Sequence, residues 1–249
     1  MTTQKNALVT GANKGIGLET ARRLAAMGSK VWLGARDAER GEAAAQALRD
    51  EGFDTEWLEL DVASDESVAG AARTLAARIS SLDALVNNAG VALGYVEALD
   101  ADGRYQRPPS RETVADMKAT YEVNVFGPVR VTQAFLPLLL AAPAARIVMV
   151  SSYIGSIARA AGDSQSPLLM SYGSSKTALN AVTVAFAREL SPRGIAVNAA
   201  APGYTATDLN AGRGRRTVQQ AAEIIVRLVT LEAGGPTGGY LDESGPLPW

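Results

Sequence analysis

The sequence predicts an α/β fold, a doubly wound parallel sheet of about seven strands with helices on both faces. Two patterns favour this class. Short apolar runs alternate with longer amphipathic runs along the chain, as in successive strand–helix–strand units. The short runs are also apolar almost throughout, which is typical of parallel strands buried on both faces.

Six of the short runs have the length and composition of strands: residues 7–10, 31–34, 57–60, 85–87, 147–150 and 195–199. Six amphipathic stretches are expected to be helices: residues 15–27, 37–51, 64–80, 111–140, 171–190 and 217–231. Ser64 is a capping-type residue at one helix start. A left-handed residue often follows a helix end, and that place is taken by Gly28, Gly52 and Gly194.

No linker rich in Gly, Ser or Pro divides the chain, so we expect one domain over residues 1–249, long enough for a sizeable core. Three polar or Gly/Pro-rich stretches fit the alternation poorly: residues 94–110, 155–167 and 204–216. Each follows the carboxyl end of a strand or precedes a candidate site helix. Ligands bind at this edge of open α/β sheets, so we expect these loops to form the substrate rim.

Composition excludes several kinds of site. The chain has no histidine and no cysteine, so it has no Ser-His-Asp triad, thiolate nucleophile, disulfide, or zinc site built from those residues. Catalysis must therefore use Ser, Tyr, Lys, Asn or carboxylates, or a cofactor. No Asp/Glu cluster has the spacing of a metal-binding loop, and we expect no metal.

Charge and hydropathy argue against two kinds of partner. The chain has 24 Lys and Arg against 26 Asp and Glu, a net charge of −2, which gives no general attraction to nucleic acid. The apolar stretch 135–150 is interrupted by Pro137, Pro143 and Arg146, and no run reaches the ~18 apolar residues of a membrane span. Because a strand begins only a few residues after Met1, we expect no signal peptide and a cytoplasmic protein.

The first strand and the first helix are joined by a glycine-rich turn, Thr10-Gly11-Ala12-Asn13-Lys14-Gly15-Ile16-Gly17. Such a turn lets backbone N–H groups and a helix N-terminus meet a pyrophosphate. Its glycine spacing differs from the common dinucleotide fingerprint, and it is not a P-loop. A tight turn without a ligand stays the alternative. If the turn binds a cofactor, the residues concerned are Gly11, Asn13, Lys14, Gly15, Ile16 and Gly17.

The end of the second strand indicates which dinucleotide would bind. An acid there often binds the adenosine ribose, whereas a nearby Arg accommodates a 2′-phosphate. In this chain Ala35 stands at or near the place of the acid and Arg36 follows it. Arg36 offers a planar fork to a phosphate, and Lys14 offers a second positive charge. We therefore expect NADP(H) rather than NAD.

A tyrosine and a lysine stand four residues apart in a predicted helix, at Tyr172 and Lys176. Residues at this spacing share a helix face, so the ammonium would stand beside the phenol. A phenol titrates near pH ~10, and an acid working near neutrality needs a pKa about 3 units lower. The ammonium and a bound cationic nicotinamide would both lower it.

Taken together, these motifs mean that the chain resembles a classical short-chain dehydrogenase/reductase, of the carbonyl-reductase type. Four motifs coincide in order: residues 10–17, Asn87-Asn88-Ala89-Gly90, the Tyr172/Lys176 pair, and Pro202-Gly203. Two more fit: Asp61-Val62 and Val123-Asn124-Val125. The similarity covers about residues 6–209. It implies a Rossmann-type fold and an NADPH-dependent reductase of a ketone or aldehyde, reversible with the alcohol.

The resemblance also implies roles for single residues. Tyr172 would protonate the carbonyl oxygen, and Ser152 would hydrogen-bond the same oxygen. Lys176 would lower the pKa of Tyr172 and hold the nicotinamide ribose, while Asn124 would hold a water that returns protons. The remaining cofactor contacts would come from Asp61 and Val62 at the adenine, Asn88 along the cofactor, Pro202, Gly203 and Thr205, and Thr207 at the carboxamide.

The chain departs from the family pattern between Ser152 and Tyr172, which lie 20 positions apart with residues 159–167 inserted. A larger insertion keeps some carbonyl reductases monomeric, so a homodimer, a homotetramer and a monomer all stay open. Two other functions are alternatives. A module that senses NADP(H) without turnover usually lacks the Tyr or the Lys, and epimerases or dehydratases of the extended branch have longer chains and a different glycine spacing.

Overall fold

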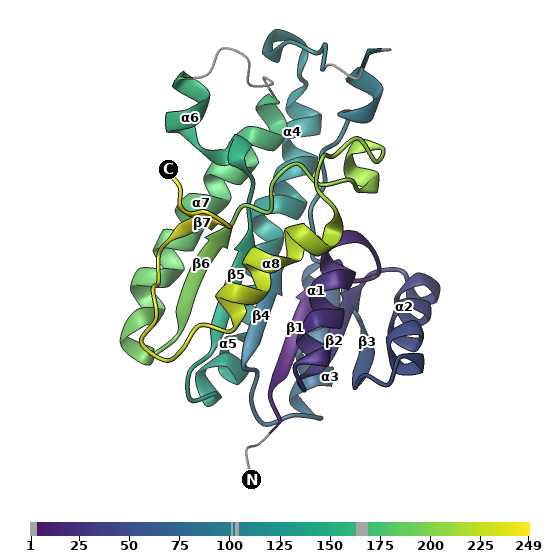
Figure 1. Cartoon of the computed structure of the whole chain (residues 1–249), viewed down its shortest axis with the longest axis vertical. Coiled ribbons are helices and arrows are strands. Elements are labelled where there is room, and N and C mark those ends of the chain that lie inside the picture. Colours follow the sequence, from purple (N-terminus) through teal and green to yellow (C-terminus); the bar gives the residue numbers. More distant parts are fainter. Residues whose placement is uncertain (1–3, 101, 103–104, 163–168) are drawn as a thin grey trace.

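The computed structural model describes residues 4–100, 102, 105–162 and 169–249. An eight-stranded sheet runs through the molecule in the order β3-β2-β1-β4-β5-β6-β7-β8 (Figure 1). The order reverses between β1 and β4, which is the doubly wound arrangement. The predicted sheet is therefore confirmed, with one strand more than the seven or so expected. Residues 101, 103–104 and 163–167 of the predicted rim loops lie outside the described residues.

The strands are β1 Asn6–Thr10, β2 Lys30–Ala35, β3 Thr55–Glu59, β4 Ala84–Asn87, β5 Arg146–Val150, β6 Ala196–Ala200, β7 Tyr240–Asp242 and β8 Gly245–Pro246. Strands β1 to β7 pair in parallel, and β8 turns back antiparallel to β7. All parallel strands therefore end at one edge of the sheet, which is the edge that carries the candidate site.

The helices are α1 Gly15–Ala26, α2 Ala38–Asp50, α3 Asp65–Ala76, α4 Val114–Tyr121, α5 Gly127–Ala141, α6 Ile157–Gly162, α7 Met170–Leu190 and α8 Val218–Val229. Five of them begin with a side chain that accepts a backbone N–H: Asp37, Ser64, Thr113, Ser156 and Thr217. Such caps each contribute about 1 kcal/mol, and they explain why these helices begin where they do.

Helices cover both faces of the sheet (Figure 1), and two apolar clusters hold them there. Successive strand residues point to opposite faces, so Leu8 enters the cluster with α3, α5 and α7, whereas Val9 enters the cluster with α1, α2 and α8. Phe135 of α5 and Ile225 of α8 are both fully buried, one in each cluster. This burial on both faces is the reason that the strands read as continuous apolar runs.

The prediction of one continuous helix over residues 111–140 is wrong. A 3₁₀ turn, Pro109–Arg111, precedes α4, and a π-helical turn, Glu122–Phe126, separates α4 from α5. By length and composition alone the whole rod Val114–Ala141 could cross a membrane. Several of its apolar side chains, among them Val131 and Phe135, pack into the core, whereas Val114 and Phe126 are exposed.

The predicted loop 155–167 is wrong over residues 157–162, which form α6. The Ser156 hydroxyl accepts the N–H of Arg159 at 3.2 Å and so caps this short helix. The N–H of Ala158 donates to the carbonyl of Trp249 at 3.0 Å. The segment after β5 is therefore tied to the C-terminal residue of the chain.

Candidate active site

The turn after β1 and the turn after β4 are bonded to each other. The Asn88 side chain donates to the carbonyls of Thr10 (2.8 Å) and Gly11 (3.2 Å). In return, the Thr10 hydroxyl accepts the N–H groups of Asn88 and Ala89, both at 3.0 Å. The Asn88 amide thus holds the glycine turn in shape. The prediction for Asn88 was only that it packs along the cofactor, and it did not include these hydrogen bonds.

The glycine turn leaves a cradle at the start of α1. A Cβ on Gly17 would lie 2.4 Å from the Asn88 Nδ2 and 2.6 Å from the Gly11 oxygen, so only glycine fits. A Cβ on Gly15 would meet only Thr207, at 3.7 Å. The N-terminus of α1, with its unpaired N–H groups and positive dipole end, begins in this space. The cradle fits the phosphates of a dinucleotide.

Of the two side chains predicted to bind the 2′-phosphate, one is exposed and the other forms an ion pair. Arg36 follows β2 directly and is exposed. Lys14 is paired with Asp208, with 2.6 Å between Nζ and Oδ2, and both side chains are mostly exposed. The Asp37 carboxylate, beside Arg36, is engaged by Arg40 through its backbone and guanidinium N–H groups. Lys14 would therefore have to exchange a carboxylate for the phosphate.

The predicted adenine residues follow β3. Asp61 is half-buried, and its Oδ1 accepts the N–H of Ala63 at 3.0 Å. Val62 is buried, and a Cβ on Gly127 at the start of α5 would lie 3.0 Å from its Cγ2. Of this pair, Asp61 is the side chain that remains partly accessible at the sheet edge.

Three of the four predicted catalytic residues meet where β5 ends against α7. Ser152 lies two residues after β5, and its hydroxyl acts to lower the pKa of the Tyr172 phenol. Lys176 lies one turn along α7 from Tyr172, with its Nζ 5.5 Å from the centroid of the phenol ring. The same Nζ donates to the carbonyl of Val150 at 2.9 Å. The prediction that Tyr172 and Lys176 share a helix face is confirmed.

Asn124, the fourth residue, reaches this group from the π-helical turn. Its amide accepts the N–H of Val91 at 2.8 Å and donates to the Val91 carbonyl at 2.9 Å and to the Ser175 hydroxyl at 3.0 Å. A Cβ on Gly90 would lie 3.3 Å from the Asn124 Oδ1 and 3.4 Å from the Lys176 Nζ. Asn124 and Lys176 therefore converge on the small space beside Gly90.

Burial dominates the electrostatics of this group. Lys176 is only 4% exposed, and burial lowers the pKa of its ammonium from 10.5 to about 8. Burial raises the pKa of the Tyr172 phenol to about 12, against a smaller lowering by the Ser152 hydrogen bond. The protein groups alone therefore do not produce the lowered phenol pKa that we expected.

The predicted nicotinamide turn follows β6. Thr205 is buried, and its hydroxyl donates to the Gly203 carbonyl at 3.1 Å. Its carbonyl accepts the amide of Asn210 at 2.9 Å. The Thr205 side chain thus holds the turn, whereas Thr207 lies beside Gly15 in the cradle.

Several side chains that support the site were not singled out in the sequence. The hydroxyls of Tyr105 and Ser171 both donate to Glu112, which links the rim loop to the residue before Tyr172. Ser151 donates to the Asn180 side chain at 2.6 Å, and Tyr240 donates to the Ser152 carbonyl. Of the supporting side chains, only Ser175 lies inside a recognised motif, Tyr-x-x-x-Lys. Tyr105 and Glu112 are seven residues apart, and the other pairs are 29 or more positions apart.

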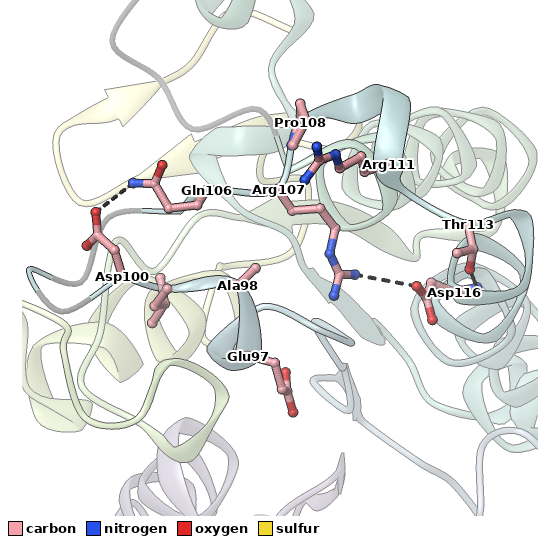
Figure 2. Close-up of a pocket in the computed structure, with 10 residues that line it drawn as sticks. Glu97, Ala98, Asp100, Gln106, Arg107, Pro108, Arg111, Thr113 and Asp116 are labelled. Atoms are coloured by element: carbon pink, nitrogen blue, oxygen red, sulfur yellow. Dashed lines mark hydrogen bonds and ion pairs between the residues drawn. The ribbon is translucent and has the colours of Figure 1, made fainter.

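A cavity of about 470 Å³ lies within the rim segment itself (Figure 2). Ten residues line it: Glu97, Ala98, Leu99, Asp100, Gln106, Arg107, Pro108, Arg111, Thr113 and Asp116. Figure 2 shows the Arg107 guanidinium directed at Asp116, 3.4 Å away, and Gln106 at Asp100. None of the ten lining residues is Ser152, Tyr172 or Lys176, so this cavity is separate from the Tyr172 site.

Comparisons with known proteins agree with this geometry. The family model described as short chain dehydrogenase matches residues 5–217. The chain is 33% identical to short-chain dehydrogenase/reductase 1 of Saponaria officinalis, over 99% of this chain and 96% of the relative. It is 33% identical to (−)-isopiperitenone reductase of Mentha piperita, over 95% and 96%. The crystal structure of NADPH-bound carbonyl reductase from chicken fatty liver superposes with a TM-score of 0.85, at 29% identity and 100% coverage of both chains.

Proposed function

The chain belongs to the short-chain dehydrogenase family, and on that premise we propose that it is an NADPH-dependent reductase of a ketone or aldehyde, reversible with the alcohol. The family makes it an oxidoreductase that acts on CH–OH and C=O groups, and its NADP(H)-bound structural relatives support the same cofactor here. The finer assignment, a carbonyl reductase with Tyr172 as its acid, is our proposal.

One observation carries the proposal. Lys176 lies with its Nζ 5.5 Å from the centroid of the Tyr172 ring, and Ser152 follows β5 near the same phenol, at the sheet edge where a dinucleotide would bind. A module that only senses NADP(H) has no need of an acid with a hydrogen-bond partner and a buried cation beside it. The convergence therefore favours turnover over sensing.

We assign each side chain one task. NADPH, when bound, supplies the hydride. The Ser152 hydroxyl donates a hydrogen bond to the carbonyl oxygen of the substrate, and the Tyr172 phenol gives its proton to the same oxygen. Lys176 holds a positive charge near the phenolate that this transfer leaves. Asn124 fixes residue 91 and the π-helical turn, beside which a water returns the proton.

We also assign the cofactor contacts. Gly11, Gly15 and Gly17 form the phosphate cradle, Asp61 and Val62 flank the adenine, and Thr207 meets the carboxamide. Arg36 and Lys14 hold the 2′-phosphate, Lys14 after release from Asp208. We expect the segments 94–110, 155–167 (which includes α6) and 204–216 to frame a small-molecule substrate, within one domain over residues 1–249. A cytoplasmic location without nucleic-acid or membrane partners stays a prediction.

The decisive experiment follows the loss of reduced-nicotinamide absorbance with NADPH and with NADH, over a panel of aromatic, aliphatic and cyclic carbonyls. Tyr172→Phe removes only the phenol hydroxyl, and it should abolish turnover while NADPH binding is retained. Tyr121→Phe is the matched control, because it also loses one hydroxyl but keeps the edge contact of its ring with Phe126. Silence of the wild type over the whole panel, with tight NADPH binding, would favour the sensing module instead.

A further inference from the structure

Arg216 lies across the turn that follows β6. Gly203 has a φ of +82°, and a Cβ there would lie only 2.4 Å from the Arg216 Cδ and 3.1 Å from its Nε. The backbone of Arg216 also closes the base of the 204–216 loop, because its N–H donates to the Tyr204 carbonyl (3.1 Å) and its carbonyl accepts the N–H of Ala206 (2.9 Å). One residue therefore contacts both the Pro202–Gly203 turn and the rim loop.

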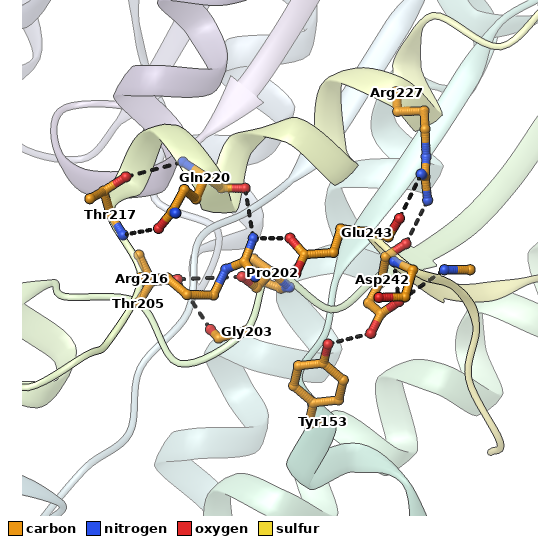
Figure 3. Close-up of polar contacts among 12 residues, drawn as sticks. Tyr153, Pro202, Gly203, Thr205, Arg216, Thr217, Gln220, Arg227, Asp242 and Glu243 are labelled. Atoms are coloured by element: carbon orange, nitrogen blue, oxygen red, sulfur yellow. Dashed lines mark hydrogen bonds and ion pairs between the residues drawn. The ribbon is translucent and has the colours of Figure 1, made fainter.

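The guanidinium of Arg216 is held by the turn between β7 and β8. Figure 3 shows it directed at Glu243, and its two terminal nitrogens donate to the two carboxylate oxygens. The same guanidinium donates to the Gln220 carbonyl in α8 at 3.2 Å. The Arg216 guanidinium holds the pKa of Glu243 below its ordinary value, so the pair stays ionised well below neutral pH. Such a two-pronged pair fixes orientation as well as distance.

The same β7–β8 turn is bonded to the catalytic strand end. The carboxylate of Asp242 accepts the phenol of Tyr153, the residue after Ser152 (Figure 3). Its other oxygen accepts the N–H groups of Ser244 (2.7 Å) and Gly245 (3.0 Å), which keeps the turn rigid. The Tyr240 hydroxyl donates to the Ser152 carbonyl. The turn therefore joins Ser152 on one side to Arg216 on the other.

We propose that Arg216 and Glu243 are positioning residues, an ion pair that holds the Pro202–Gly203 turn and the 204–216 loop in register with Ser152. Neither touches the reacting atoms. Their catalytic effect rests on the function proposed above, since it consists in aligning the nicotinamide-facing turn with the residues that bind the carbonyl oxygen. The holding of the loop does not depend on that function and can be tested without turnover.

The test compares Glu243→Gln with two other variants. Glu243→Asp keeps the charge. Glu51→Gln is the matched control, because Glu51 also pairs with an arginine, Arg22, and has a similar side-chain exposure, 39% against 44% for Glu243. The readouts are the rate of trypsin cleavage after Arg213 and Arg215, followed by mass spectrometry, the Kd of NADPH, and kcat and KM for a carbonyl that the wild type reduces.

For Glu243→Gln we expect cleavage about fivefold faster, because the loop opens locally more often. We expect kcat/KM to fall about tenfold, mainly through kcat, since small misalignments of reacting groups are costly. The Kd of NADPH should stay within about threefold, because Gly11, Gly15 and Gly17 of the phosphate cradle lie outside the 204–216 loop, which contributes only Thr207 to it. Glu243→Asp should recover most of both losses, and Glu51→Gln should match the wild type.

Three results would overturn the proposal. In the first, Glu243→Gln behaves like Glu51→Gln in every readout. In the second, Glu243→Gln is cleaved faster by trypsin but keeps the wild-type kcat and KM. In the third, Glu243→Gln loses kcat/KM but is cleaved no faster. Failure of the proposed function looks different. In that case the wild type reduces no carbonyl, and the cleavage rates alone decide whether the pair holds the loop.

Discussion

Lys176 should destabilise the protein in which it acts. Burial lowers the pKa of its ammonium from 10.5 to about 8, so the unfolded chain binds this proton more tightly than the folded chain does. The resulting cost to the folded state is fully present below about pH 8 and disappears as pH rises above about 10.5. At pH 7 it amounts to about 3 kcal/mol, and at about pH 9.5 it falls to about 1 kcal/mol.

Replacement of Lys176 by Met removes this cost together with the hydrogen bond to the Val150 carbonyl, which is worth about 1 kcal/mol. Without added cofactor, Lys176→Met should therefore be more stable than the wild type by about 2 kcal/mol at pH 7 and about equal to it near pH 9.5. Urea unfolding followed by tryptophan fluorescence at both pH values measures this difference. Lys118→Met, at an exposed position of α4, is the control.

The pH dependence decides the matter. A stability difference between Lys176→Met and the wild type that does not shrink with rising pH would refute the reasoning, even if the variant is the more stable protein. The same would hold if Lys118→Met showed an equal change with pH. A confirmed result would mean that the protein gives up stability to keep a cation beside Tyr172.

Four further outcomes are expected. Arg36→Ala should weaken NADPH but not NADH binding, by about 1.5–3 kcal/mol in a titration; equal loss for both cofactors would contradict a phosphate contact. Asp208→Asn should tighten NADPH about two- to threefold more than NADH, because Lys14 no longer has to leave a carboxylate, and a looser NADPH complex would oppose this. Phe135→Ala should cost about 3–5 kcal/mol in urea unfolding, since the ring is fully buried. Gly17→Ala should weaken binding of both cofactors in the same titration, because its Cβ would strike the Gly11 carbonyl and the Asn88 amide; unchanged affinities would refute the cradle.

Local patterns were enough to predict most of the fold. Strands buried on both faces leave continuous apolar runs, and six such runs marked β1 to β6. The last two strands were missed because they are three and two residues long and exist through pairing with β6 and with each other. The six-residue helix α6 was missed too, since the turns around it looked like an irregular insertion.

For the site, the sequence could not predict features that depend on contacts between residues distant in the chain. The four-residue spacing was enough to place Tyr172 and Lys176 on one face of α7. The depth of burial, which decides the direction of both pKa shifts, depends on the surrounding elements and was not visible in the motif. In the same way, Lys14 was predicted as a phosphate ligand, but its pairing with Asp208 joins residues 194 positions apart.

The π-helical turn at Glu122–Phe126 makes the length of this segment as important as its composition. It accommodates a residue that a regular helix would not hold. Deletion of one residue there would restore a regular helix and leave α4 and α5 close to their present orientation, because the wide turn takes up one residue within its own length. The side chains inside the turn would change place, and Asn124 would turn away from Val91. The extra residue therefore serves the site rather than the packing of α4, and its deletion should cost activity more than stability.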